Sequence, residues 1–118
     1  FIPHKDTPFK LEKQGELKDV ITMLAIIRLL LPDVLLPATT ALGTISNKGR
    51  EMGIKAGANV VMPNLSPISV RDKYSLYNNK ICTGDEAAEC RCCIEKRINS
   101  IGFEIDLGRG DSLNWIRR

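Results

Sequence analysis

The sequence predicts an α/β fold organised around one strand–helix–strand unit in residues 35–64. Two short apolar stretches indicate the strands. Leu35–Thr40 is apolar until it ends in two threonines, and Val60–Met62 is apolar until Pro63. Short apolar runs that stop abruptly are typical of buried parallel strands. Two parallel strands joined by a helix form a βαβ unit, which is right-handed almost without exception.

The segment between these strands is predicted to be helical. Residues 47–56 are mostly helix formers, and Ser46 precedes them as a candidate N-cap. Gly57 follows at the position where the end of a helix favours a left-handed residue. We therefore expect one helix from Asn47 to Ala56, ended by a turn at Gly57.

The clearest helix precedes this unit, over Glu16–Leu31, and Pro32 ends it. Its lower half, residues 26–31, is apolar on nearly every side, which predicts burial between layers. The predicted apolar face consists of Leu17, Val20, Ile21, Leu24, Ile27 and Leu31.

Two further helices are expected in the C-terminal half. One covers Val70–Tyr77 and places Tyr74 and Tyr77 on one face, because they are three residues apart. The other covers Cys90–Ser100, with Gly102 as its C-cap. Its apolar spacing uses Cys93 or Ile94, Arg97 or Ile98, and Ile101, and Trp115-Ile116 is a candidate packing anchor in the tail.

Two strands alone would leave open sheet edges, which proteins avoid. A (β/α) barrel whose other strands lie upstream explains this pattern. The chain starts with Phe1 rather than methionine, in a Pro-rich loop over residues 1–9. We therefore expect it to be part of a longer protein.

The composition excludes several classes of function. A net charge of +3 with 5% aromatic residues forms no basic face interleaved with aromatics, which argues against nucleic-acid binding. No apolar run approaches the roughly 18 residues that a membrane span requires, and the N-terminus lacks the pattern of a signal peptide. We expect a cytoplasmic protein of about one domain.

Polar residues follow both predicted strands. Thr39-Thr40 ends the first strand, and Met62-Pro63-Asn64 ends the second. Ligands of parallel α/β folds bind beyond the carboxyl ends of the strands, so paired hydroxyl groups there could hold an anion. The alternative is structural: threonine favours strands and caps, and methionine fills cores. Tyr74 and Tyr77 could line a pocket or cover the barrel rim.

Four cysteines lie within twelve residues, as Cys82-x7-Cys90-x2-Cys93 with Cys92 as an extra. Such tight clustering suits metal or cluster ligation better than a disulfide framework. Three thiolates are compatible with an iron–sulfur or a zinc site, both of which need a fourth ligand. The alternative is a set of free thiols.

Several longer motifs together resemble one known family. FIPHKDTP, LLPATTALGTI, GREMGIKAGANVVMPN and YSLY, followed by the cysteine motif, are similar to the C-terminal part of the radical S-adenosylmethionine maturases of [FeFe]-hydrogenase. This family lies within the wider group that includes biotin synthase. The resemblance covers residues 1 to about 93.

The resemblance implies a (β/α)8 TIM barrel in the complete enzyme. Residues 1–80 would supply the loop after strand 6, helix 6, strand 7, helix 7, strand 8 and helix 8. Residues 81–118 would form a cysteine-containing extension with a C-terminal helix and tail. The enzyme would cleave S-adenosylmethionine at a [4Fe–4S] cluster, and the resulting radical would act on a cysteine-bound Fe(CO)2CN complex. Implied partners are the N-terminal half of the barrel and other hydrogenase maturation proteins.

The resemblance also implies roles for individual residues. Thr39 and Thr40 match positions near the anion and substrate pocket, and the cysteines match the motif of an auxiliary [2Fe–2S] or [4Fe–4S] cluster. Positions near S-adenosylmethionine are matched by Ile2, Met62 and Tyr74. Asn64 and Tyr77 complete the predicted binding set, and Cys82, Cys90 and Cys93, with Cys92 as an extra, form the predicted metal set.

One departure from the family is large: the Cys-x3-Cys-x2-Cys signature that holds the catalytic cluster is missing. We therefore expect the chain alone to be inactive and to self-associate through its open strand edges. Alternative interpretations are a stand-alone thiolate iron–sulfur or zinc module, a biotin synthase-like enzyme, and a purely structural docking domain.

Overall fold

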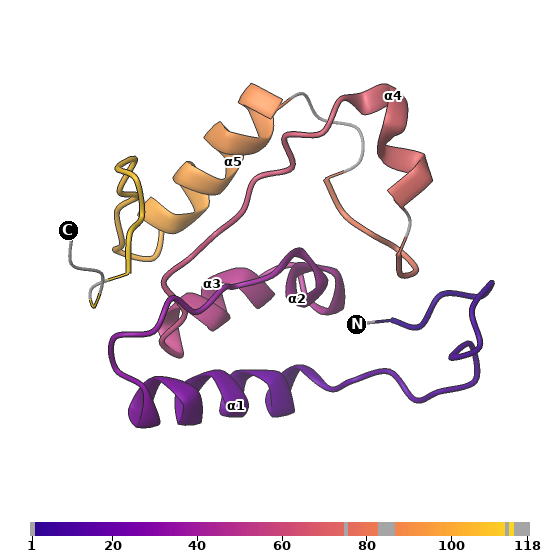
Figure 1. Ribbon diagram of the computed structural model, residues 1–118, viewed down its shortest axis with the longest axis horizontal. Coiled ribbons are helices and arrows are strands. Elements are labelled where there is room, and N and C mark those ends of the chain that lie inside the picture. The colour runs from indigo at the N-terminus through magenta and orange to yellow at the C-terminus, as the bar shows by residue number, and fades with distance from the viewer. Residues whose placement is uncertain (1, 75, 83–86, 113, 115–118) are drawn as a thin grey trace.

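The computed structural model describes residues 2–74, 76–82, 87–112 and 114. The predicted Trp115-Ile116 anchor therefore lies outside the described residues. The elements in chain order are α1 (Leu17–Leu30), α2 (Thr40–Ile45), α3 (Gly49–Lys55), α4 (Ile68–Arg71), the 3-10 helix η1 (Asp72–Tyr74) and α5 (Ala87–Asn99). Figure 1 shows α1 beneath α2 and α3, with α4 and α5 beyond them.

Helix α1 confirms the strongest sequence prediction, since it begins and ends one residue inside the predicted bounds. Leu24 is buried, and most of the predicted apolar face packs against the core. The predicted burial of Leu31 and of the lower half is wrong: Leu29 is 83% and Leu30 is 73% exposed. The described residues place α2 and α3 against α1, and no second layer of described residues covers these leucines.

The two predicted strands are parallel, as expected. Pro37 and Val60 form a parallel bridge. The Ala38 N–H donates to the Val60 carbonyl at 2.9 Å, and the Val60 N–H donates to the Leu36 carbonyl at 3.1 Å. The Oδ1 atom of Asn59 also accepts from the Leu36 N–H at 2.8 Å.

The predicted length of these strands is wrong. In the described part of the chain, the pairing amounts to this isolated bridge rather than to two extended strands. A pair with no further strand beside it makes few ladder hydrogen bonds, and such a pair is marginal by itself.

The helix predicted over residues 47–56 is α3, which begins two residues later and ends one residue earlier than predicted, and an unpredicted helix, α2, precedes it. Thr40 is the first residue of α2, and the Thr39 hydroxyl caps it by accepting from the Leu42 N–H at 3.3 Å. Ser46 is therefore the C-cap of α2, not the N-cap of α3. A Cβ at Gly49 would lie 2.1 Å from the Leu42 carbonyl oxygen, so the close turn between the helices requires glycine.

The turn after α3 follows the prediction. Gly57 has a φ of +110°, which favours glycine. Its carbonyl accepts from Arg28 Nε at 2.7 Å. A Cβ at Gly57 would approach the Arg28 side chain to 2.6 Å. This turn therefore ties α1 to the end of α3.

The C-terminal helices differ in their bounds from the predictions. The helix predicted over 70–77 is the shorter pair α4 and η1, so Tyr77 lies beyond it and shares no helix face with Tyr74. Helix α5 begins three residues before the predicted start. Gly102 has a φ of +84°, in agreement with its predicted role after this helix.

One hydrophobic cluster runs through the molecule. It consists of Leu24, Leu36, Ala38, Leu42, Ile54, Ala58, Cys90, Ile94 and Ile98. Cys90, Ile94 and Ile98 recur every four residues on α5 and present one face to this cluster. Residues from both predicted parts, 1–80 and 81–118, thus share one core, and a domain boundary between them stays a prediction. No helix among the described residues is long and apolar enough to cross a membrane.

Candidate functional site

The parallel pairing determines where the predicted binding residues lie. Because the segments around Pro37 and Val60 run in the same direction, the residues that follow each bridge position lie at the same edge, beyond the carboxyl ends of both segments. Thr39 and Thr40 follow the first segment, and Met62 follows the second. This is the edge at which parallel α/β proteins bind ligands.

One direct contact joins two predicted binding residues that are far apart in the sequence. The Thr40 and Tyr77 hydroxyl oxygens are 2.9 Å apart and share a hydrogen bond. The neighbouring Asn78 N–H donates to the Ile2 carbonyl at 3.2 Å. The N-terminal loop, the start of α2 and the loop after η1 therefore meet at one place.

Two other predicted binding residues project outward. The Met62 side chain is 54% exposed and the Tyr74 side chain is 58% exposed. The described residues thus leave much of both side chains open to a ligand or to another chain segment. Their roles in ligand binding stay predictions.

Asn64 connects this edge to the cysteines. Its Nδ2 donates to the Cys82 carbonyl at 2.9 Å, and its backbone N–H donates to Cys90 Sγ at 3.3 Å. The Asn64 Oδ1 atom accepts from the Ser66 N–H at 3.2 Å. The Asn64 amide therefore supports the cysteine-bearing segment, a contact that its place after an apolar run did not predict.

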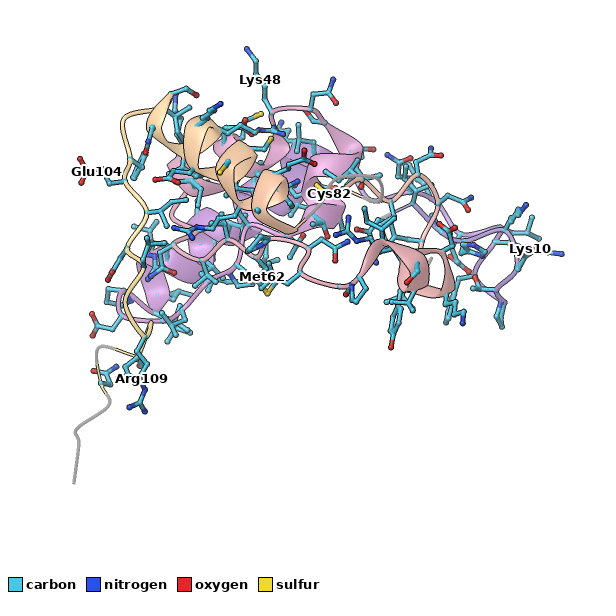
Figure 2. All side chains as sticks on the ribbon, turned by 90° about the horizontal axis from the view of Figure 1, so that it is seen from above. Lys10, Lys48, Met62, Cys82, Glu104 and Arg109 are labelled. Atoms are coloured by element: carbon cyan, nitrogen blue, oxygen red, sulfur yellow. The ribbon has the colours of Figure 1, made fainter. Side chains whose placement is uncertain are left out.

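The cysteines border a cavity of about 200 Å³ between α5 and the α2–α3 pair. Figure 2 shows Cys82 next to α5, while Lys48 and Met62 lie on opposite sides of the molecule in that view. The lining residues are Gly43, Asn47, Arg50, Ile81, Cys82, Cys90, Cys93, Ile94 and Arg97. Three of the four cysteines thus face one cavity, and the exposed Cys92 is not among them.

Cys82 and Cys90 border the same cavity but differ in their surroundings. Burial raises the pKa of the Cys90 thiol, a hydrogen bond from the Asn64 backbone opposes this, and the charge and hydrogen bond of Cys82 raise it further. Cys82 Sγ also accepts a hydrogen bond from Arg50 Nη2 at 3.2 Å. The two thiols therefore differ, because one is buried and the other is partly accessible beside a guanidinium group.

The backbone at Cys82 adopts an uncommon conformation. Its φ is +60°, in the left-handed region, which costs a non-glycine residue about 1–2 kcal/mol. Hydrogen bonds from Asn64 and Arg71 hold its carbonyl, the latter from Nη1 at 3.2 Å. Arg71 Nε also donates to the Ser66 carbonyl at 2.8 Å, so this arginine clamps two loops together.

Arg50 is the pocket residue that sequence reasoning missed. It is 5% exposed, although a basic residue within a short helix usually points to solvent. A Cβ at Gly43 would lie 3.1 Å from Arg50 Nε and 2.7 Å from Ile81 Cδ1, so glycine leaves room for both side chains. The spacing of Gly43 and Arg50 in the sequence does not by itself predict that the Arg50 side chain packs against Gly43.

An ion pair joins the two walls of the cavity. Arg97 on α5 donates to the Glu51 carboxylate on α3 at 2.6 and 2.9 Å, and also to the Asn47 carbonyl. Burial by itself raises the pKa of Glu51. Hydrogen bonds from Arg97 and the backbone, together with the charges of Arg97 and Arg50, outweigh burial, so the pKa of Glu51 is below its ordinary value. The same pairing raises the pKa of Arg97.

The described thiols do not form a complete metal site. No group of three His, Cys, Asp or Glu side chains within the described ranges is arranged as metal ligands. Asn64 contacts both Cys82 and Cys90, while Cys93 shares only the cavity wall with them. An auxiliary cluster at Cys82, Cys90 and Cys93 therefore stays a prediction, and its fourth ligand is not identified.

These features define a mainly helical chain, in its described residues, with polar residues at the carboxyl edge of one parallel bridge. No family model matches the chain. Over 102 residues it is 47% identical to the [FeFe] hydrogenase maturase subunit HydE of Thermotoga maritima, a match that covers 86% of this chain and 29% of that protein. The chain is therefore homologous to HydE over this segment, which confirms the resemblance seen in the sequence.

Proposed function

We propose that this chain forms part of the ligand-binding mouth of a radical S-adenosylmethionine enzyme resembling HydE. The observation that carries the proposal is the 47% identity over 102 residues, which extends through both strand-like segments and the cysteines. The parallel Pro37–Val60 bridge supports it, because that pairing is what two neighbouring strands of a (β/α)8 barrel require.

Three of the proposed binding residues, Thr39, Thr40 and Met62, follow the parallel bridge at the edge described above. Thr39 and Thr40 would hold an anionic group of the substrate through their hydroxyl groups and nearby N–H groups. Met62, Tyr74 and Ile2 would line the region that receives S-adenosylmethionine. The exposure of Met62 and Tyr74 supports this, because side chains that bind a ligand must be reachable.

The Thr40 hydroxyl group would present a fixed orientation to a ligand rather than rotate freely. Its hydrogen bond with Tyr77 restricts the rotation of both hydroxyl groups. Since one hydroxyl must donate and the other accept, this bond determines which lone pairs and which proton remain for a ligand. A fixed hydroxyl loses less entropy on binding than a rotating one.

The chain would not perform the radical chemistry by itself. A [4Fe–4S] cluster elsewhere in the enzyme would supply the electron for cleavage of S-adenosylmethionine, and the chain lacks the Cys-x3-Cys-x2-Cys sequence that holds such a cluster. The chain would contribute binding and orientation. In hydrogenase maturation the substrate would be a cysteine-bound iron carbonyl cyanide complex, and the partners would be the other maturation proteins of a cytoplasmic pathway.

Complementation tests this function. The chain is co-expressed with the part of T. maritima HydE that lies outside the matched segment, the cluster is reconstituted anaerobically, and 5′-deoxyadenosine is measured. We expect product only when both parts are present. Thr40→Val should lower it, while Thr22→Val, at an exposed threonine of α1, should leave it unchanged. Product from the chain alone, or equal effects of both substitutions, would contradict the proposal.

A second candidate function is a thiolate metal module, because three cysteines border one cavity. Anaerobic iron–sulfur reconstitution of the chain should then produce charge-transfer absorption. That absorption should disappear in a variant with Cys82, Cys90 and Cys93 changed to alanine and remain in Cys92→Ala. Absence of the absorption in the unmodified chain would remove this candidate.

A further inference from the structure

Cys82 and Cys90 are placed as a reactive thiol pair. Both side chains border the same cavity, and Asn64 donates one hydrogen bond to the Cys82 carbonyl and another to the Cys90 sulfur. We propose that they form a reversible disulfide in which Cys82 reacts first with a peroxide and Cys90 then resolves the product. This modification requires neither S-adenosylmethionine nor an iron–sulfur cluster, so it goes beyond the proposed function.

Cys82 is the sulfur that an oxidant can reach. It is partly exposed, whereas Cys90 is buried at 2% exposure. Arg50 Nη2 lies 3.2 Å from Cys82 Sγ and donates to it. Reactive cysteines are characteristically accessible and close to a cationic side chain, and Cys82 meets both conditions.

Cys90 is held in place to complete the disulfide. Its sulfur accepts from the Asn64 N–H at 3.3 Å, while the Asn64 side chain holds the Cys82 carbonyl at 2.9 Å. Arg71 holds the same carbonyl. Asn64 therefore holds both cysteines at the same cavity.

The other two cysteines are placed less well for this reaction. Cys92 is exposed and does not border the cavity. Cys93 borders the cavity but is exposed, whereas Cys90 is buried and held by the Asn64 N–H. Adjacent helical residues also point about 100° apart, so Cys92 and Cys93 do not face each other.

The reaction balances with a hydroperoxide as the oxidant. The Cys82 sulfur attacks the peroxide, so the O–O bond breaks, an S–O bond forms, and the alcohol or water leaves. The Cys90 sulfur then attacks the sulfenic acid, forming the S–S bond and releasing water. Two thiols lose two electrons and two protons in total, and a dithiol reductant restores them by exchange.

Tryptic mapping tests the pairing directly. Cleavage after Lys80, Arg91 and Lys96 places Cys82 and Cys90 in one peptide, 81–91, and Cys92 and Cys93 in another, 92–96. The reduced, metal-free 118-residue chain is treated with about one equivalent of hydrogen peroxide, alkylated and digested. We expect peptide 81–91 unalkylated and lighter by two hydrogens, peptide 92–96 doubly alkylated, and full reversal by dithiothreitol.

Single substitutions separate the roles of the cysteines. Cys82→Ser should abolish the internal disulfide and lower peroxide consumption, and Cys92→Ser should leave both unchanged. In Cys90→Ser, Cys82 should remain as a sulfenic acid that dimedone traps. A link between peptides 81–91 and 92–96, or alkylation of both cysteines in peptide 81–91 after peroxide treatment, would overturn the proposal. This mapping uses the unmodified chain, so it holds even if a variant fails to fold.

Discussion

The cavity beside α5 and the polar edge after the two strand-like segments differ in how much of their surroundings this chain provides. Around the cavity, Arg50 is buried and Arg97 is paired with Glu51 across the walls. At the edge, Met62 and Tyr74 are more than half exposed. The cavity is closed by contacts within the chain, and the polar edge is open to solvent.

This difference shows which properties the chain can possess alone. Thiol chemistry at the cavity depends on groups that are all present, whereas ligand binding at the edge would need further walls. The chain spans 29% of the length of HydE, which accords with an edge that is only partly built. Four predictions test this comparison.

Truncation on the cavity side should cost far more stability than truncation at the edge. Ile94→Ala removes a buried side chain from the core and should lower the free energy of unfolding by about 2–5 kcal/mol. Met62→Ala, at an exposed apolar residue, should change it by less than about 0.5 kcal/mol. Urea unfolding followed by circular dichroism measures both, and equal losses would show that the edge is as well packed as the cavity.

The ion pair across the cavity should make stability depend on pH. Glu51→Gln should cost about 1–2 kcal/mol at neutral pH, because Arg97 loses a charged partner. The folded-state pKa of Glu51 is lowered, so its contribution is present above its unfolded pKa and is lost as pH falls through the lower folded value. Unfolding curves from neutral to acidic pH should therefore converge for the two proteins. The exposed Lys13–Glu16 pair provides the control, and Glu16→Gln should have little effect.

The Thr40–Tyr77 hydrogen bond should contribute modestly, since it is the one contact at the edge that joins two predicted binding residues within the described chain. Thr40→Val and Tyr77→Phe should each cost about 0.5–1.5 kcal/mol. Because both remove the same bond, the double variant should cost less than the sum of the two. Additive losses in urea unfolding would mean that the hydroxyl groups act independently.

The exposed leucines at the end of α1 should affect association more than folding. Leu29 and Leu30 lie on an apolar surface that we propose mediates self-association of the chain. Leu30→Ser should change the unfolding free energy by less than about 0.5 kcal/mol but shift sedimentation toward the monomer. Lys18→Ser on the same helix should leave sedimentation unchanged, and a monomeric unmodified chain would contradict this proposal.

The sequence predicted correctly those features that depend only on residues close together in the chain. Helix α1 follows from apolar spacing and a terminating proline, and Gly57 follows from the backbone conformation that ends α3. The parallel direction of the two apolar stretches also agrees with the structure. Helix α2 was not predicted, and neither was the tight turn between α2 and α3, because that turn depends on the close approach of Gly49 to Leu42.

The sequence alone therefore predicted helices α1, α3 and α5, the parallel direction of the two strand-like segments, and the homology to HydE. Only the tertiary structure decided that Arg50 is buried beside Cys82, that Asn64 supports the cysteines, and that Thr40 bonds to Tyr77. The physical reason is the range of the interactions. Helix periodicity and glycine conformation act within a few residues, whereas these contacts join residues 18 to 37 positions apart, which only the folded chain brings together.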